Sequence, residues 1–198
     1  MAKLLMIDNY DSFTYNLVDE LKLLSHQVTV VRNSLSLATL KQLASEHDVV
    51  VISPGPSSPN EAGQCLALLE DEAMNVPILG ICLGHQIICQ SAGATITRAP
   101  QPVHGKATDM THNSQACFET LPNPIRIARY HSLVAKDLPS SLAVIATSGE
   151  QVMAVYQANK NRLGLQFHPE SILTTYGSLL LQRAVNFLLN SNFEGARR

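Results

Sequence analysis

Residues 76–91 read VPILGICLGHQIICQS, an apolar run that passes directly into a helical pattern. Short apolar runs bounded by turns are typical of buried parallel strands. We therefore expect a strand over residues 76–81 and a helix over residues 85–91, which Gly93 can end in the left-handed conformation. This strand-to-helix junction is the unit from which a parallel α/β sheet is built.

The same alternation fills the chain on the N-terminal side of this junction. Apolar runs predict strands, and apolar residues spaced by three to four positions predict helices. The expected strands are 3–7, 27–31 and 49–52, and the expected helices are 13–24, 35–45 and 61–74. Repeated strand–helix units predict an α/β fold with an open, mostly parallel sheet and helices on both of its faces.

The C-terminal half has a different texture. Between residues 94 and 157, short β-prone runs are separated by Pro, Gly, Asn and Ser, which predicts a small antiparallel β section. Residues 163–167 return to a strand pattern and residues 177–190 to an amphipathic helix. Because no linker or internal repeat interrupts the pattern, we expect one domain over residues 1–198, with residues 192–198 as a frayed tail.

Composition narrows the class of protein. The chain has 198 residues, of which 45% are hydrophobic and 15% charged, so it can bury a core and is not disordered. A net charge of -2 without basic runs argues against a nucleic-acid partner. No apolar stretch approaches the roughly 20 residues that span a bilayer, and Asp8 interrupts any signal-peptide pattern. We expect a cytoplasmic protein with no membrane partner.

The cysteine pattern indicates free thiols. The chain has four cysteines without a C-x-x-C pair, and no histidine stands at metal-finger spacing. A chain of this size does not need disulfides. We expect reduced thiols and no metal site, with the cysteines at Cys65, Cys82, Cys89 and Cys117.

Cys82 occupies a position with chemical meaning. It is the centre of a G-x-C-x-G motif over residues 80–84, the cysteine form of a nucleophile elbow, in which glycines permit a tight strand-to-helix turn. The helix N-terminus favours a thiolate there, and the backbone N–H of Leu83 is placed to hold an oxyanion. Read alone, the motif fits a buried structural cysteine equally well.

A second motif, QFHPE at residues 166–170, stands at the end of the last expected strand. Residues two apart on an extended chain share a face, so His168 could act as a base towards Cys82 while Glu170 orients its ring. By itself the motif also fits a surface turn with a solvated His and Glu. The two motifs together favour a triad of Cys82, His168 and Glu170.

A third motif, SPGPSSP at residues 53–59, follows another buried strand and should emerge at the same sheet edge as Cys82. A loop rich in Pro and Gly is rigid, and rigid N–H groups suit a second oxyanion donor. Proline has no N–H, so the candidates are Gly55, Ser57 and Ser58. Alone, this loop would be an ordinary tight connection.

These three motifs together resemble the class I, triad-type glutamine amidotransferases, and the resemblance runs through essentially the whole chain. It implies a mostly parallel central sheet and a triad of Cys82, His168 and Glu170. Many relatives have glycine where this chain has Ser57, which leaves the loop conformation open, and Gly55 beside Leu83 is the preferred oxyanion pair. The resemblance also implies glutamine contacts from Gly55, Pro56, Ser57, Leu83, Gln86, Ser132 and Leu133.

A finer pattern is similar to the glutaminase subunits of anthranilate synthase and of aminodeoxychorismate synthase. It lies in residues 8–14, 104–106, 129–134 and 168–174. The similarity implies hydrolysis of L-glutamine through a cysteine thioester and delivery of ammonia to a chorismate-binding large subunit, component I of either enzyme. It implies no cofactor in this chain, with magnesium in the partner. The implied partner interface comprises Asn9, Tyr10, Asp11, Ser12, His104 and Lys106.

Several alternatives remain at this point. Residues 133–139 and 172–177 favour the anthranilate (tryptophan) branch over the p-aminobenzoate (folate) branch, but one subunit could serve both. A stand-alone cysteine hydrolase of γ-glutamyl or peptide substrates would turn over without a partner, whereas an amidotransferase subunit should accelerate when its partner reshapes the site. A non-catalytic binding subunit is a third reading.

Overall fold

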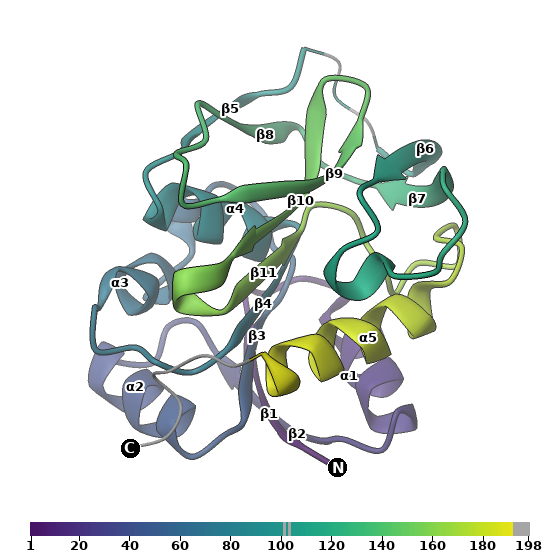
Figure 1. Ribbon diagram of the computed structural model, residues 1–198. Coiled ribbons are helices and arrows are strands. Elements are labelled where there is room, and N and C mark those ends of the chain that lie inside the picture. The colour runs from purple at the N-terminus through teal and green to yellow at the C-terminus, as the bar shows by residue number, and fades with distance from the viewer. Residues whose placement is uncertain (101, 103, 192–198) are drawn as a thin grey trace.

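The computed structural model describes residues 1–100, 102 and 104–191 (Figure 1). The tail predicted over residues 192–198 lies outside this part of the chain. Within it, a nine-stranded sheet has the order β2-β1-β3-β4-β11-β10-β9-β6-β7. These strands are β1 (Lys3–Asp8), β2 (Gln27–Arg32), β3 (Val49–Ile52), β4 (Ile78–Ile81), β6 (Lys106–His112), β7 (Ile125–Arg129), β9 (Ala143–Ser148), β10 (Gln151–Gln157) and β11 (Arg162–Leu165).

The first five strands of that order run parallel, as the strand–helix alternation predicts. Every residue of β3, β4 and β11 is buried. A strand covered on both faces has no solvent-facing side, which is why these segments read as continuous apolar runs rather than alternating ones. The central strands are therefore the elements of the fold that the sequence predicts most directly.

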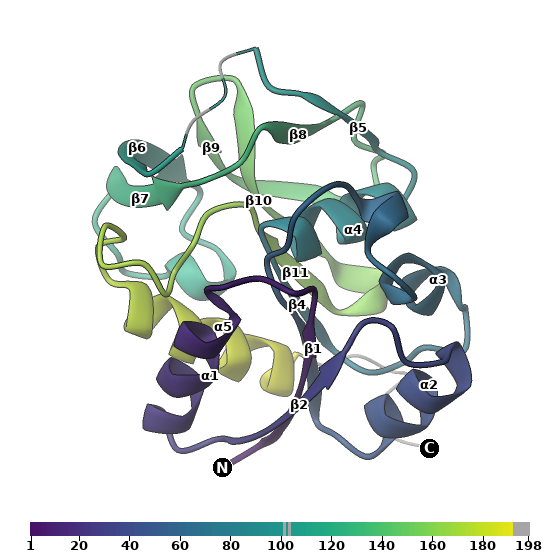
Figure 2. The same cartoon turned by 180° about the vertical axis from the view of Figure 1, so that it is seen from behind.

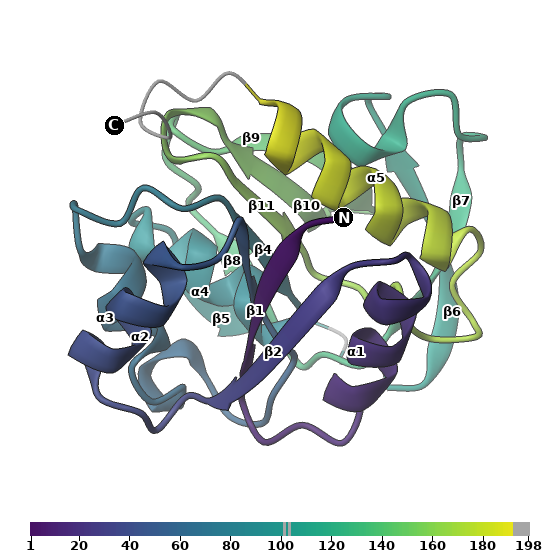
Figure 3. The same ribbon diagram turned by 90° about the horizontal axis from the view of Figure 1, so that it is seen from below.

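Helices cover both faces of the parallel strands (Figure 3). The helices are α1 (Thr14–Leu23), α2 (Leu37–Ser45), α3 (Cys65–Glu70), α4 (Leu83–Ser91) and α5 (Gly177–Asn190). The apolar sides of α1 and α5 pack with one face of the sheet into one core, and those of α2, α3 and α4 pack with the other face into a second core. The α/β class expected from the sequence is confirmed.

Helix α3 differs from the prediction because it is shorter than residues 61–74. A single 3-10 turn, Pro59–Glu61, precedes it, and Gly63 then adopts φ +58°. A Cβ at Gly63 would lie 2.4 Å from the Asn33 carbonyl oxygen, so the chain passes directly against the neighbouring loop there. That close approach interrupts the helical backbone, and the regular helix begins only at Cys65.

The antiparallel section predicted between residues 94 and 157 is present in two parts. Strands β10, β9, β6 and β7 extend the central sheet beyond β11 with antiparallel pairing. Strands β5 (Thr95–Arg98) and β8 (Leu133–Lys136) form a separate antiparallel pair, which lies over α4 in the view from behind (Figure 2). This pair brings residues 131–133 beside the start of α4, near Cys82. In the described residues, no helix is long and apolar enough to cross a membrane.

Candidate active site

The polar residues singled out in the sequence meet at one edge of the parallel sheet. Asn9 follows β1, Ser53 follows β3, Cys82 follows β4 and Gln166 follows β11. The carboxyl ends of parallel strands lie at a common edge, and open α/β sheets bind ligands there, next to the point where the strand order reverses. In this sheet β1 lies between β2 and β3, so the order reverses beside the loop that follows β3.

Cys82 is held in a strained turn between β4 and α4. Its φ of 52° and ψ of -98° lie outside the regions that side-chain-bearing residues favour, and its N–H donates to the Leu165 carbonyl at 2.8 Å. Both glycines of the motif are required sterically. A Cβ at Gly80 would lie 2.4 Å from the Gly84 carbonyl oxygen, and one at Gly84 would lie 2.3 Å from the Ile52 carbonyl oxygen. The motif therefore forms an elbow, with Cys82 at the N-terminus of α4.

His168 and Glu170 form a buried pair close to Cys82. Their side chains are 4% and 1% exposed, and His168 Nδ1 lies 2.6 Å from Glu170 Oε1. The backbone around them is fixed, because the His168 N–H donates to the Ala128 carbonyl and the Thr174 hydroxyl donates to the His168 carbonyl. Residues two apart thus meet through a tight turn after β11, and the surface-turn alternative does not describe this segment.

The protonated form of His168 is stabilised by its neighbours. Burial lowers the pKa of His168, but hydrogen bonding and charge interactions with Cys82 and Glu170 outweigh it and raise that pKa to about 10. The Nε2 atom nevertheless meets no partner with hydrogen-bond geometry among the described residues. Cys82 is thus near enough to favour the imidazolium, while Nε2 keeps a free donor position. A free donor beside a thiol is what the predicted general acid needs.

An aromatic cluster covers His168, and of its members only His104 was expected at a functional surface. The ring centroids of Tyr130 and Phe13 lie 5.0 and 6.0 Å from that of His168, and His104 packs edge-on against Tyr130 at 5.4 Å. These residues come from three distant parts of the chain. The sequence held no signal for the cluster, because nothing in the local patterns places Phe13 and Tyr130 next to each other.

A pocket of about 160 Å³ opens beside Cys82. This volume lies below the range of about 300–1,000 Å³ typical of drug-sized ligands, so the pocket suits a small molecule. All seven residues expected to contact glutamine line it. Its lining is Gly55, Pro56, Ser57, Cys82, Leu83, Gln86, Tyr130, His131, Ser132 and Leu133, of which Tyr130 and His131 were not anticipated.

The loop after β3 reaches the start of α4 beside Cys82. A Cβ at Gly55 would lie 2.8 Å from Leu83 Cδ2, so the loop is pressed against the first residue of α4. The N–H groups of Gly55 and Leu83 donate to no acceptor within the described part of the chain, which leaves both available to a ligand. Ser57 has φ +66°, a conformation that glycine adopts more readily, so the replacement of glycine noted in the sequence keeps the left-handed turn.

The residues expected at a partner interface fall into two groups. Tyr10 is 56% exposed, with Arg32 stacked 4.7 Å from its ring centroid, and Ser12, His104 and Lys106 are also exposed, while Asp11 is half-buried. The prediction that Asn9 lies at the partner interface is corrected, because this residue is only 3% exposed. Its amide donates to the Ser53 carbonyl and accepts from Asn33, so its side chain joins the loops after β1, β2 and β3 instead of facing outward.

The remaining cysteines are structural. Cys65, Cys89 and Cys117 are buried free thiols, and burial raises the pKa of each to about 12. Among the described residues no group of three or more His, Cys, Asp or Glu side chains could hold a metal ion. Of the four cysteines, Cys82 is the one that lines the pocket beside α4.

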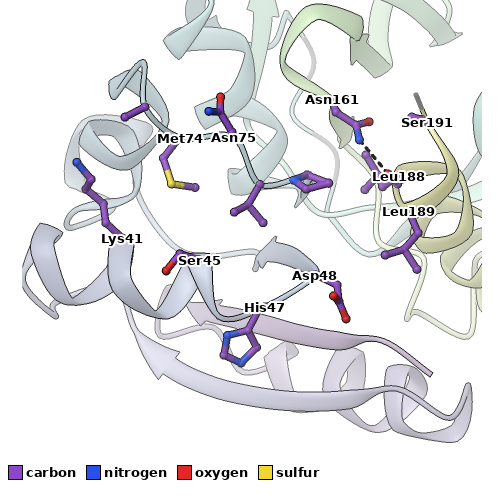
Figure 4. A pocket seen from close by; sticks show the side chains of 13 residues that line it. Lys41, Ser45, His47, Asp48, Met74, Asn75, Asn161, Leu188, Leu189 and Ser191 are labelled. Atoms are coloured by element: carbon purple, nitrogen blue, oxygen red, sulfur yellow. Dashed lines mark hydrogen bonds between the residues drawn. The ribbon is translucent and has the colours of Figure 1, made fainter. Parts of the chain in front are cut away.

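A larger cavity, of about 520 Å³, lies at the opposite end of the parallel strands (Figure 4). Its residues precede β3, β4 and β11 or belong to α2 and the end of α5, as the labelled Asp48, Asn161 and Leu188 illustrate. Several of its polar groups are engaged within the protein: Asn161 donates to the Leu188 carbonyl, Asp48 accepts from the Lys3 N–H, and His47 contacts Leu43 and Thr29. This cavity holds none of the predicted site residues.

The elbow, together with the His168–Glu170 pair beside it, has the geometry expected of an α/β enzyme with a cysteine nucleophile. A family model described as "Glutamine amidotransferase class-I" matches residues 5–187. The chain belongs to the class I glutamine amidotransferase family.

Similar proteins of known name agree with this assignment. The chain is 45% identical to anthranilate synthase component 2 of Vibrio parahaemolyticus over 97% of this chain and 99% of the relative. It is 48% identical to anthranilate synthase component 2 of Pseudomonas aeruginosa over 93% of this chain and 94% of the relative. A crystal structure described as a putative GMP synthase protein from Thermoplasma acidophilum superposes with a TM-score of 0.84 at 28% identity, covering 95% of this chain and 94% of that one.

Proposed function

We propose that the chain is the glutaminase subunit of an anthranilate synthase. It would hydrolyse L-glutamine at Cys82 and pass ammonia to a chorismate-binding partner. The observation that carries the glutaminase activity is the 160 Å³ pocket, which has Cys82 in its wall and two unengaged backbone N–H groups beside it. The relatives named anthranilate synthase component 2, which align over nearly the whole chain, support the branch.

In the first half of the reaction, the Cys82 thiolate attacks the side-chain carboxamide carbon of glutamine. A C–S bond forms, and the negative charge moves to the amide oxygen, where the N–H groups of Gly55 and Leu83 would stabilise it. An amide is a poor electrophile, and removing one such donor typically costs about 2.7–4 kcal/mol of barrier. A fixed oxyanion site is therefore a requirement of this chemistry.

His168 supplies the proton that makes the amide nitrogen a leaving group. Protonated Nε2 donates to that nitrogen, the C–N bond breaks, and ammonia departs from a γ-glutamyl thioester. Neutral His168 then accepts a proton from water as the water oxygen attacks the thioester. Breakage of the C–S bond yields glutamate and regenerates the thiolate beside an imidazolium, which Glu170 orients and stabilises.

The partner would bind at the edge of the sheet that carries the site. Around the aromatic cluster, several large apolar side chains are exposed, including Tyr10 at 56%, Phe13 at 37% and Ile172 at 99%. Exposed apolar residues gathered at a site mark interaction surfaces. Because Phe13 packs on Tyr130 and His168, a partner docked on this surface would act directly on the geometry of His168.

The proposal includes a cytoplasmic location and no cofactor in this chain. All four cysteines are free thiols, and a reducing compartment keeps the Cys82 thiol available. Magnesium would belong to the chorismate-binding partner.

The test is glutamate release from glutamine by wild-type protein and Cys82→Ser, each with and without chorismate and the large subunit of an anthranilate synthase. We expect release that depends on both Cys82 and the partner, with anthranilate formed in the same reaction. If only an aminodeoxychorismate synthase large subunit elicits release, the branch is wrong. Full release without any partner would favour a stand-alone hydrolase, and no Cys82-dependent release would overturn the glutaminase proposal.

Tyr10→Ala tests the docking surface. Loss of this exposed ring should weaken complex formation while leaving the fold intact. The matched control is Tyr15→Ala, which removes another exposed tyrosine, 57% exposed on α1. Equal affinity of wild-type and Tyr10→Ala protein in a titration with the large subunit would contradict the assignment of this surface.

A further inference from the structure

A continuous series of hydrogen bonds leads from the interior to the sulfur of Cys82. It begins at Arg129, which is 5% exposed at the end of β7 and whose Nε donates to His131 Nε2 at 3.1 Å. A guanidinium only donates, so Nε2 of His131 is the unprotonated nitrogen. Nδ1 then carries the proton and donates to the Leu133 carbonyl at 3.0 Å. Burial and the adjacent Arg129 charge lower the pKa of His131 to about 4, which keeps this ring neutral.

The Leu133 carbonyl connects this part of the series to two glutamines. It accepts a second hydrogen bond from Gln86 Nε2 at 3.2 Å, and the same Nε2 donates to Gln166 Oε1 at 3.2 Å. A carbonyl oxygen only accepts, so the amide of Gln86 must present its NH₂ to Leu133 and Gln166. Gln166 consequently presents its oxygen to Gln86 and its own NH₂ to Cys82, with Nε2 3.8 Å from Sγ.

Gln166 itself has little freedom to turn. It is 0% exposed, and its backbone N–H donates to the Met153 carbonyl at 2.8 Å in β10. Reversing its amide would place Oε1 against Sγ and set two NH₂ groups against each other at Gln86. Each such mismatch leaves a buried polar group unpaired, which is costly. The orientation of the NH₂ towards sulfur is thus imposed by the Leu133 carbonyl through Gln86. The hydrogen bonds from Arg129 to His131 and from His131 to Leu133 hold that carbonyl in place.

We propose that Gln166 is a positioning residue whose NH₂ group, oriented by the Arg129–His131–Leu133–Gln86 series, donates to Cys82 Sγ and holds the sulfur as a thiolate facing the pocket. A donor stabilises the charged form of an acid, whereas an acceptor at the same place would favour the thiol. No proton moves along the series. The inference rests on the proposed nucleophilic role of Cys82.

The same series also fixes the substrate pocket. His131, Leu133 and Gln86 line it, so the groups that orient Gln166 are those expected to touch glutamine. A purely space-filling glutamine at position 166 would stabilise the fold but would leave the ionisation of Cys82 unchanged. That difference makes the inference measurable.

The experiment is the pH dependence of Cys82 alkylation by iodoacetamide in the full-length chain, with the modified cysteine identified by peptide mass spectrometry. Gln166→Met removes the donor at similar volume. We expect the midpoint to move to higher pH by about one unit, which lowers the rate about ten-fold at pH values well below the wild-type midpoint. Gln157→Met is the matched control, because Gln157 is a buried glutamine at the end of β10 outside the series. It should keep the wild-type midpoint.

Two further variants separate positioning from packing. Gln166→Glu keeps the shape and the acceptor for Gln86 but removes the donor, so its midpoint should also rise, and it decides the question if Gln166→Met does not fold. Arg129→Met removes the donor that holds His131. The midpoint of Cys82 alkylation should then rise by less than in Gln166→Met. The double variant Arg129→Met/Gln166→Met should rise no further than Gln166→Met alone, because groups acting through one series are not additive.

An unshifted midpoint in a folded Gln166 variant, or additive shifts in the double variant, would overturn the inference. The proposed function fails separately, if wild-type protein with its large subunit releases no Cys82-dependent glutamate. An active wild type with an unshifted midpoint in the variants would leave the proposed function standing and remove only the role of Gln166.

Discussion

The two ends of the parallel strands contrast in the way they use polar side chains. The cavity at the amino end is the larger, about 520 Å³ against about 160 Å³, yet its Asn161, Asp48 and His47 side chains are engaged within the protein. The pocket at the carboxyl end has a strained cysteine, unengaged N–H groups and a His168 Nε2 without an acceptor in the described part of the chain. The difference teaches that unsatisfied, convergent polar groups locate chemistry in this molecule, whereas the size of a hollow does not.

Glu170→Gln should give the largest effect and sharpen the contrast at the carboxyl end. The neutral amide no longer stabilises the imidazolium or fixes the ring, so kcat for glutamine hydrolysis should fall by about 10²–10⁴-fold. KM should change little, because Glu170 does not line the pocket. Steady-state kinetics with the large subunit present measure both constants. A kcat within a few-fold of wild type would show that the pair is not catalytic.

Gly84→Ala tests whether the elbow depends on close packing. A Cβ there would lie 2.3 Å from the Ile52 carbonyl oxygen, which forces β3 and α4 apart. The free energy of unfolding should fall by about 3 kcal/mol or more. Gly149→Ala is the control, since Gly149 has φ +58° but open space around it, and only the left-handed strain of about 1–2 kcal/mol applies. Urea denaturation compares the two, and equal losses would show that the close approach is not limiting.

The buried histidines predict how stability depends on pH. Burial lowers the pKa of His85 to about 4, from 6.5 in an unfolded chain. Between these values the unfolded chain binds more protons, so stability is complete above pH 6.5 and is lost as the pH falls through 4. The loss from His85 should be about 3 kcal/mol. His85→Gln should flatten this limb of the stability curve in denaturant titrations, and an unchanged slope would contradict the assignment.

The opposite sign applies to His168. Its pKa is raised to about 10, so the stability that its charged form contributes is present below pH 6.5 and is lost as the pH rises through 10. His85 and His168 therefore limit stability from opposite sides of neutrality.

The smallest effect on glutamate release should come from a substitution in the amino-end cavity. This substitution tests the contrast between the two ends of the parallel strands. Asn75→Ala removes an exposed amide from the rim of this cavity, and glutamate release should change by less than about two-fold, since such substitutions usually cost under about 0.5 kcal/mol. A loss comparable to that of Glu170→Gln would mean that the large cavity communicates with the site.

Local patterns predicted most of the fold. The strands at β1, β3 and β4 and the helix at α5 were anticipated within a few residues, because burial on two faces or on one stripe leaves a periodic signal. The predicted range of helix α3 was too long, because the contact between Gly63 and Asn33 that shortens the helix joins residues 30 positions apart. The interior role of Asn9 was missed for the same reason, since its partners are Ser53 and Asn33.

The sequence by itself determined the elbow around Cys82, the spacing of His168 and Glu170, and the loop with Gly55, because each depends on neighbours along the chain. Only the tertiary structure decided what surrounds them. The aromatic cover of Phe13 and Tyr130 on His168, and the series from Arg129 to Gln166 that orients the donor at Cys82, join segments up to 155 residues apart. Contacts of that kind arise from the order of strands in the sheet, which no local period encodes.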